Sequence, residues 1–136
     1  MRRIIASALL LFSLAIATPA AADNLANYPF SLAKIDPKAL AAWQRILPPK
    51  FKRIDWVYRL DGTAEEMKRV EIGGKPYFLG WVCKPHDCGN QLAFLIAQDR
   101  SRAVGVVQSE QTGNLPLWLG SPTAEEIQML RDKLSG

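Results

Sequence analysis

The chain has 136 residues, and its 17 lysine and arginine side chains outnumber its 13 aspartate and glutamate side chains, for a formal charge of +4. This length suits one small domain with a single core. The basic residues are scattered and the charge is mild, which excludes the phosphate-tracking surface of a nucleic-acid-binding protein.

The first 22 residues are organised like a secretory signal peptide. Two arginines precede an uncharged apolar run over residues 4–17, and small residues before position 23 fit the rule for signal cleavage. The apolar run is too short for a membrane span of about 20 residues. We therefore predict cleavage after Ala22, a single mature domain of residues 23–136 in the periplasm, and no membrane attachment after cleavage. Loss of the two arginines leaves 15 basic and 13 acidic side chains, a formal charge of +2.

The first predicted element of the mature chain is a helix. Asp36 suits its N-cap and Pro37 its first position, and apolar residues then recur at spacings of three and four up to Leu47. The two prolines that follow Leu47 end this helix. Residues 50–62 fit either an extended segment or short helices, and both readings stay open.

Five later segments have the composition of strands. They are residues 67–72, 75–83, 91–98, 103–109 and 115–119. The Gly73-Gly74 pair supplies the positive φ angles of a tight hairpin turn between the first two. The third segment is apolar at every interior position, so we expect a central strand with both faces covered. Pro116 favours an edge position for the fifth segment.

The chain ends in a second predicted helix. Thr123 and Glu126 form a capping box, and an apolar stripe that ends at Leu134 faces the core. A helix, a run of hairpin-connected strands and a final helix predict an α+β domain, with a central antiparallel sheet of about five strands flanked by helices. Residues 83–90 then form a protruding loop between two neighbouring strands.

This loop contains both cysteines of the chain, Cys83 and Cys88. In an exported protein such a pair is expected to be a disulfide, because the periplasm keeps cysteines oxidised. A ring this small stabilises a fold by only about 2 kcal/mol on the chain-entropy estimate. Local rigidity is therefore a better reason for the pair than global stability.

The tip of the loop is polar and stiff. Pro85 fixes its own φ angle and restricts the residue before it. The candidate functional residues held in this way are Lys84, Pro85, His86 and Asp87, and His86 is the only histidine of the chain. Such a preorganised loop suits insertion into the cleft of another protein, because little entropy is lost on docking.

Residues 83–88 also allow interpretations other than a binding loop. A turn fastened by a disulfide, with an exposed histidine of no function, is the main alternative. Metal binding would use Cys83, His86, Asp87 and Cys88, but a disulfide consumes both thiolates and no zinc-type spacing is present. The spacing also differs from the C-x-x-C of redox sites, and no base-activated nucleophile is evident. We therefore expect no metal, no cofactor and no enzymatic activity.

The loop sequence also resembles a known family. The string "CKPHDC" from Cys83 to Cys88, followed by Gly89, is similar to the hallmark of the periplasmic inhibitors of vertebrate, or c-type, lysozyme, the Ivy family. The similarity extends more loosely over residues 47–108, through "LPPKF", "VEIGGKPYFLGWV" and "QLAFLIA".

The resemblance implies an antiparallel sheet flanked by helices, a Cys83–Cys88 disulfide and a loop that plugs the lysozyme active-site cleft. It further implies that His86 engages the two catalytic carboxylates, that Asp87 assists, and that Lys84 and Pro85 shape the contact. A second candidate partner is an endogenous lytic transglycosylase of the cell, which the same loop would restrain. The sequence leaves a homodimer open.

Overall fold

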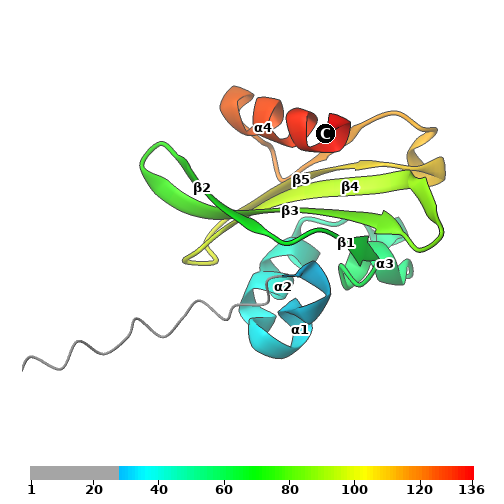
Figure 1. Ribbon diagram of the computed structural model, residues 1–136, viewed down its shortest axis with the longest axis horizontal. Coiled ribbons are helices and arrows are strands. Elements are labelled where there is room, and N and C mark those ends of the chain that lie inside the picture. Colours follow the sequence, from blue (N-terminus) through cyan, green and yellow to red (C-terminus); the bar gives the residue numbers. More distant parts are fainter. Residues whose placement is uncertain (1–27) are drawn as a thin grey trace, which may run out of the picture.

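A computed structural model describes residues 28–136 (Figure 1). The predicted signal peptide, residues 1–22, lies outside the described residues. Within residues 28–136, no helix is long and apolar enough to cross a membrane.

The centre of the domain is an antiparallel sheet of six strands. The strands are β1 (Thr63–Ala64), β2 (Lys68–Ile72), β3 (Lys75–Lys84), β4 (Asp87–Ala97), β5 (Ala103–Gln108) and β6 (Leu117–Leu119). Their order is β1-β3-β4-β5-β6. Strand β2 pairs with β3 on the same side as β1, β2 with the first half of β3 and β1 with its end. The sheet is thus five strands wide, as predicted, and the additional strand β1 is a two-residue pairing against the end of β3.

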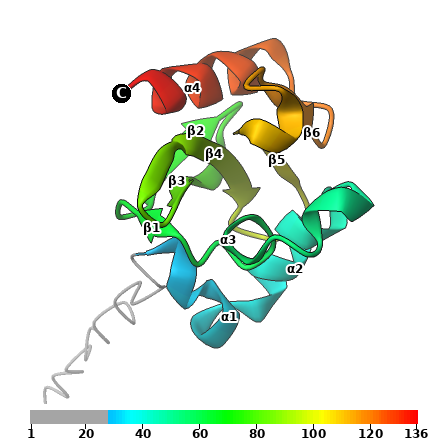
Figure 2. The ribbon, with the colours of Figure 1, turned by 90° about the vertical axis from the view of Figure 1, so that its right-hand side faces the viewer.

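Helices cover both faces of this sheet, which confirms the predicted α+β class. One face carries η1 (Pro29–Ser31), α1 (Leu32–Ile35), α2 (Pro37–Arg45), η2 (Pro49–Phe51) and α3 (Asp55–Tyr58), and the other face carries α4 (Ala124–Ser135) (Figures 1 and 2). A short 3-10 helix, η3 (Glu110–Thr112), connects β5 to β6.

Strand β4 alternates its side chains between two hydrophobic clusters. Leu92 and Phe94 pack with the N-terminal helices, whereas Ala93 and Leu95 pack against the α4 side, and all four are fully buried. Because successive side chains of a strand point to opposite faces, a strand covered on both sides must be apolar throughout. The predicted central strand is therefore confirmed.

The N-terminal helical region begins as predicted, and the structure decides between the two conformations left open for residues 50–62. Asp36 caps α2, with its carboxylate accepting from the backbone N–H of Ala39 at 3.1 Å. Trp43 is fully buried on α2, and its indole Nε1 donates to the carbonyl oxygen of Val57 in α3 at 2.7 Å. The segment that the sequence left ambiguous is short helical rather than extended, and the Trp43–Val57 hydrogen bond joins α3 to α2.

The C-terminal helix is also fastened at its start. Thr123 and Glu126 form the predicted capping box. Glu126 is buried, and its Oε1 lies 2.6 Å from Nη2 of Arg102, which follows the β4–β5 turn. Leu130 is fully buried against the sheet, whereas Leu134 is only partly buried. This helix is therefore held by an apolar stripe and by two ion pairs, Glu126 with Arg102 near its start and Lys133 with Glu65 near its end.

Candidate functional site

The candidate site is the turn between β3 and β4. Lys84 pairs with Asp87, so only Pro85 and His86 connect the two strands. The loop is thus shorter than the predicted residues 83–90, because both strands continue into the polar segment. Backbone pairing requires no apolar side chains, so a polar sequence does not by itself end a strand.

A register shift accompanies this turn. Cys83 pairs with Gln91 while the next residue, Lys84, pairs with Asp87. Residues 88–90 therefore have no counterpart on β3 and form an irregularity at the start of β4. Such bulges bend a strand and redirect its side chains.

The backbone at His86 adopts a left-handed conformation, with φ of +64°. Proline at the preceding position and a positive φ here are the features of a type II turn, in which glycine is the usual residue. Holding a residue with a Cβ in this region costs about 1 kcal/mol. Pro85, His86 and Asp87 are all exposed and Lys84 is partly exposed, so the imidazole lies at an accessible tip.

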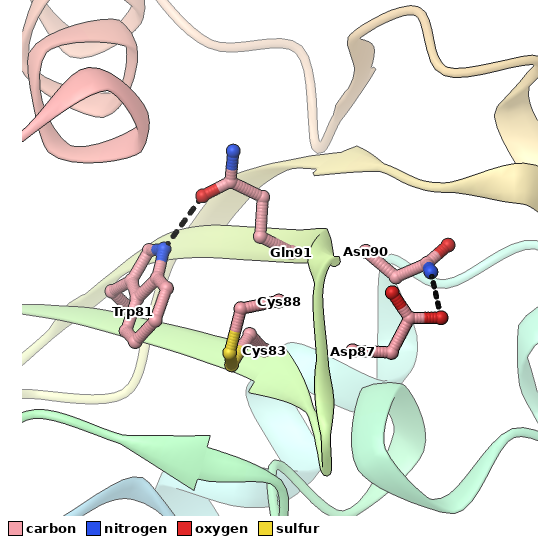
Figure 3. Close-up of a disulfide and its surroundings, with 6 residues drawn as sticks. All are labelled: Trp81, Cys83, Asp87, Cys88, Asn90 and Gln91. Carbon is pink, nitrogen blue, oxygen red and sulfur yellow. Dashed lines mark hydrogen bonds between the residues drawn. A yellow bond between two sulfur atoms is a disulfide. The ribbon is translucent and has the colours of Figure 1, made fainter.

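A disulfide closes the turn from one side. Cys83 and Cys88 are bonded, with their Cα atoms 4.8 Å apart, which confirms the predicted pairing (Figure 3). Cys83 is fully buried and Cys88 is exposed. The bond therefore joins the tip to the body of the sheet.

A buried amide holds the turn from the other side. Asn90 is 5% exposed, and its Nδ2 donates to Oδ2 of Asp87 at 3.0 Å (Figure 3). Its Oδ1 accepts from the backbone N–H of Glu110, the first residue of η3, at 2.8 Å. Asn90 thus fixes Asp87 and connects the turn to a second segment. Asn90 was not predicted from the sequence, because a single asparagine after "CG" carries no signal of burial.

Neighbouring polar contacts stiffen the base of the turn. Trp81 is partly buried on β3, and its Nε1 donates to Oε1 of Gln91 on β4 at 2.8 Å (Figure 3). This bond crosses the same strand pair that the disulfide joins. The turn is consequently anchored over several residues below its tip.

The turn has the features of a binding element. Both cysteines are in the disulfide, and residues 28–136 contain no group of three histidine, cysteine, aspartate or glutamate side chains arranged to hold a metal ion. What the arrangement presents is one imidazole on a preorganised polar tip. Fold and site together define a small α+β domain that offers a rigid, disulfide-closed turn to its surroundings.

Comparison with known proteins gives the family. The family model for inhibitors of vertebrate lysozyme (Ivy) matches residues 39–133. An inhibitor of vertebrate lysozyme from Pseudomonas aeruginosa is 28% identical over 69% of this chain and 69% of its own length. An uncharacterized protein of the same bacterium is 31% identical over 94% of this chain and 90% of its own, and one of Yersinia pestis is 27% identical over 66% and 65%.

The chain therefore belongs to the Ivy family, as its turn sequence predicted. The description of that family is of an inhibitor and not of an enzyme, and it implies lysozyme as a protein partner.

Proposed function

We propose that this protein inhibits c-type lysozyme by inserting the β3–β4 turn into the active-site cleft, where His86 engages the two catalytic carboxylates. The observation that carries this proposal is the conformation of His86, an exposed side chain at positive φ on the tip of a disulfide-closed turn. The family membership supplies the class of target.

The chemistry of the target suits an imidazole. A lysozyme cleaves glycosidic bonds with one carboxylic acid of raised pKa and one ionised carboxylate. Neutral imidazole has one N–H donor and one acceptor nitrogen, so His86 can donate to the ionised carboxylate and accept the proton of the acid. The resulting charged histidine would form charge-assisted hydrogen bonds in a cleft from which water is excluded.

The rigidity of the turn favours such docking. Pro85, the disulfide and the Asp87–Asn90 hydrogen bond fix the tip before it meets a partner. Binding then loses little conformational entropy, and more of the contact energy remains as affinity. In this proposal Lys84 and Pro85 shape the contact, and Asp87 both orients the tip and lies at its exposed surface.

The proposed place of action is the periplasm. The predicted signal peptide, residues 1–22, would deliver the mature domain, residues 23–136, to the compartment where lysozyme attacks peptidoglycan. An oxidising compartment also suits the disulfide between Cys83 and Cys88.

The test is His86→Ala, assayed by the turbidity of a bacterial suspension lysed by purified c-type lysozyme. The wild-type protein is expected to stop lysis at stoichiometric amounts, and the variant to need at least 100-fold more, because hot-spot residues at the centre of an interface contribute several kcal/mol. Lys38→Ala, an exposed substitution on α2, serves as the control and should inhibit like the wild type. Equal inhibition by His86→Ala and wild type would overturn the mechanism.

The second candidate partner enters as a parallel arm of this test. A purified lytic transglycosylase replaces lysozyme in the same assay. Inhibition of the transglycosylase alone, with lysozyme unaffected, would transfer the proposal to the endogenous target.

A further inference from the structure

The turn shares its end of the molecule with a second exposed segment. Strand β5 ends at Gln108, which pairs with Gln91 near the start of β4, and η3 follows directly. Figure 2 looks onto this end of the sheet, where the β3–β4 turn and η3 both face the viewer. The residues that follow η3, 113–116, lead back to β6. We call residues 110–116 the η3 segment.

This segment presents an apolar side chain to solvent. Leu115 is 69% exposed, more than the other exposed large hydrophobic residues of the described chain. Single exposed leucines are common and need no explanation on their own. The position of Leu115 is what distinguishes it, because it lies at the end of the sheet that also carries His86.

Hydrogen bonds hold the segment in a fixed shape. Thr112 Oγ1 donates to the carbonyl oxygen of Leu115 at 2.6 Å, and the backbone N–H of Asn114 donates to the carbonyl oxygen of Ser109 at 2.8 Å. Gly113 and Asn114 both take positive φ angles, +65° and +60°. Leu115 is therefore presented by a preorganised backbone.

The segment is also tied to its neighbours. Asn90 joins its first residue, Glu110, to Asp87 of the turn. From η2, Lys50 Nζ donates to the carbonyl oxygen of Gln111 at 3.2 Å. His86 and Leu115 thus belong to two segments that are joined through one buried amide, that of Asn90.

We propose that the η3 segment is a second contact of the inhibitor, with Leu115 packing on the wall of the lysozyme cleft that His86 enters. This inference rests on the proposed function. Ligand-binding clefts are lined mainly by hydrophobic and aromatic side chains, with a few placed polar groups. An exposed leucine on a rigid segment complements such a wall, while the polar turn complements the carboxylates deeper in the cleft.

The test compares the wild type, two Leu115 variants, a control variant and His86→Ala in their affinity for a purified c-type lysozyme, measured by surface plasmon resonance. Leu115→Ala is expected to raise Kd about tenfold, mainly through a faster off-rate, and Leu115→Asp at least 100-fold, because a charge would be buried against the wall. Ile35→Ala is the matched control. Ile35 is 47% exposed on α1, and the next residue, Asp36, binds Arg100 of the β4–β5 turn at the opposite end of the sheet. The control should bind like the wild type.

The outcomes separate this inference from the function on which it rests. Tight binding by the wild type, loss of binding in His86→Ala and wild-type Kd in both Leu115 variants would overturn the second contact alone. Failure of the wild type to bind lysozyme would overturn both proposals. The expected losses, with unfolding temperatures like that of the wild type, would support the contact.

Discussion

Two hairpin turns of the same sheet reverse the chain through residues at positive φ, but they use different residue types. The β2–β3 turn uses Gly73 and Gly74, at φ of +58° and +77°, whereas the β3–β4 turn uses Pro85 and His86, with His86 at +64°. Glycine reaches positive φ without a steric penalty, and histidine does not. The second turn therefore accepts a conformational cost that a glycine would remove. We infer that the side chain of His86 is kept for what it presents.

The two turns also differ in their support. The second turn is closed by the Cys83–Cys88 disulfide and braced by the hydrogen bond between Asn90 and Asp87. Residues held in unfavourable backbone regions persist where the surrounding structure determines them, and they cluster at functional sites. The β2–β3 turn has no disulfide to close it.

Making the second turn like the first should have the largest effect. In His86→Gly the backbone strain disappears, so the free energy of unfolding should rise by about 1 kcal/mol. Inhibition of lysozyme should fall at least 100-fold, because the imidazole is gone. Denaturant unfolding and the lysis assay measure the two quantities on the same sample. A variant that is stabilised and still inhibits would show that strain at this position has no functional purpose.

Removing the support of the second turn should have the next largest effect. Replacing Cys83 and Cys88 together by alanine should lower the free energy of unfolding by about 2 kcal/mol, the value for a ring of this size. The affinity for lysozyme should fall as well, since the tip must then be ordered on binding. The measurement is denaturant unfolding alongside calorimetric titration. If the double variant binds lysozyme with the affinity of the wild type, the claim that the disulfide preorganises the tip is contradicted.

Making the first turn like the second should change stability only. Gly74→Ala places a Cβ at φ of +77° and should cost about 1 kcal/mol of unfolding free energy. A Cβ at this position meets no atom within 4 Å, so the cost is one of backbone strain and not of collision. Inhibition should equal that of the wild type. Reduced inhibition by a correctly folded Gly74→Ala would place this turn in the binding surface and break the contrast.

The smallest effect concerns the ion pair between Glu126 and Arg102, which is remote from the β3–β4 turn. Burial raises the pKa of Glu126. Hydrogen bonds from Arg102 and Thr123, together with the charge of Arg102, outweigh this effect, so the pKa lies below its ordinary value of 4.5. A carboxyl with a lowered pKa stabilises the fold above its ordinary pKa, and that contribution is lost as the pH falls through the folded value. The unfolding free energy of the wild type should therefore fall more between pH 7 and pH 3 than that of Glu126→Gln, so the two proteins converge in acid. Parallel pH profiles would contradict this role.

Short-range sequence patterns predicted most of the helices and strands that surround the site. The Asp36 cap, the glycine turn and the capping box at Thr123 depend on residues close in sequence, and each is confirmed. The central strand was predictable because burial on two faces requires an unbroken apolar run.

The remainder depended on contacts between distant residues. Continuation of β3 and β4 into the polar segment follows from backbone pairing, which leaves no mark on side-chain composition. The burial of Asn90 depends on Glu110, 20 residues away, and the helical fold of residues 55–58 depends on Trp43. The turn sequence indicated the site, while its attachment to the η3 segment needed the structure.

The central claim is that this turn occupies the catalytic cleft of lysozyme. The most direct measurement is a calorimetric titration of the mature protein into c-type lysozyme, with and without a saturating N-acetylglucosamine trimer that fills the cleft. If the turn enters the cleft, the apparent Kd rises by a factor of one plus the ratio of the sugar concentration to the Kd of the sugar, the value for simple competition, and His86→Ala binds weakly in both titrations. Wild-type binding with the same Kd in the presence of the sugar would contradict the account.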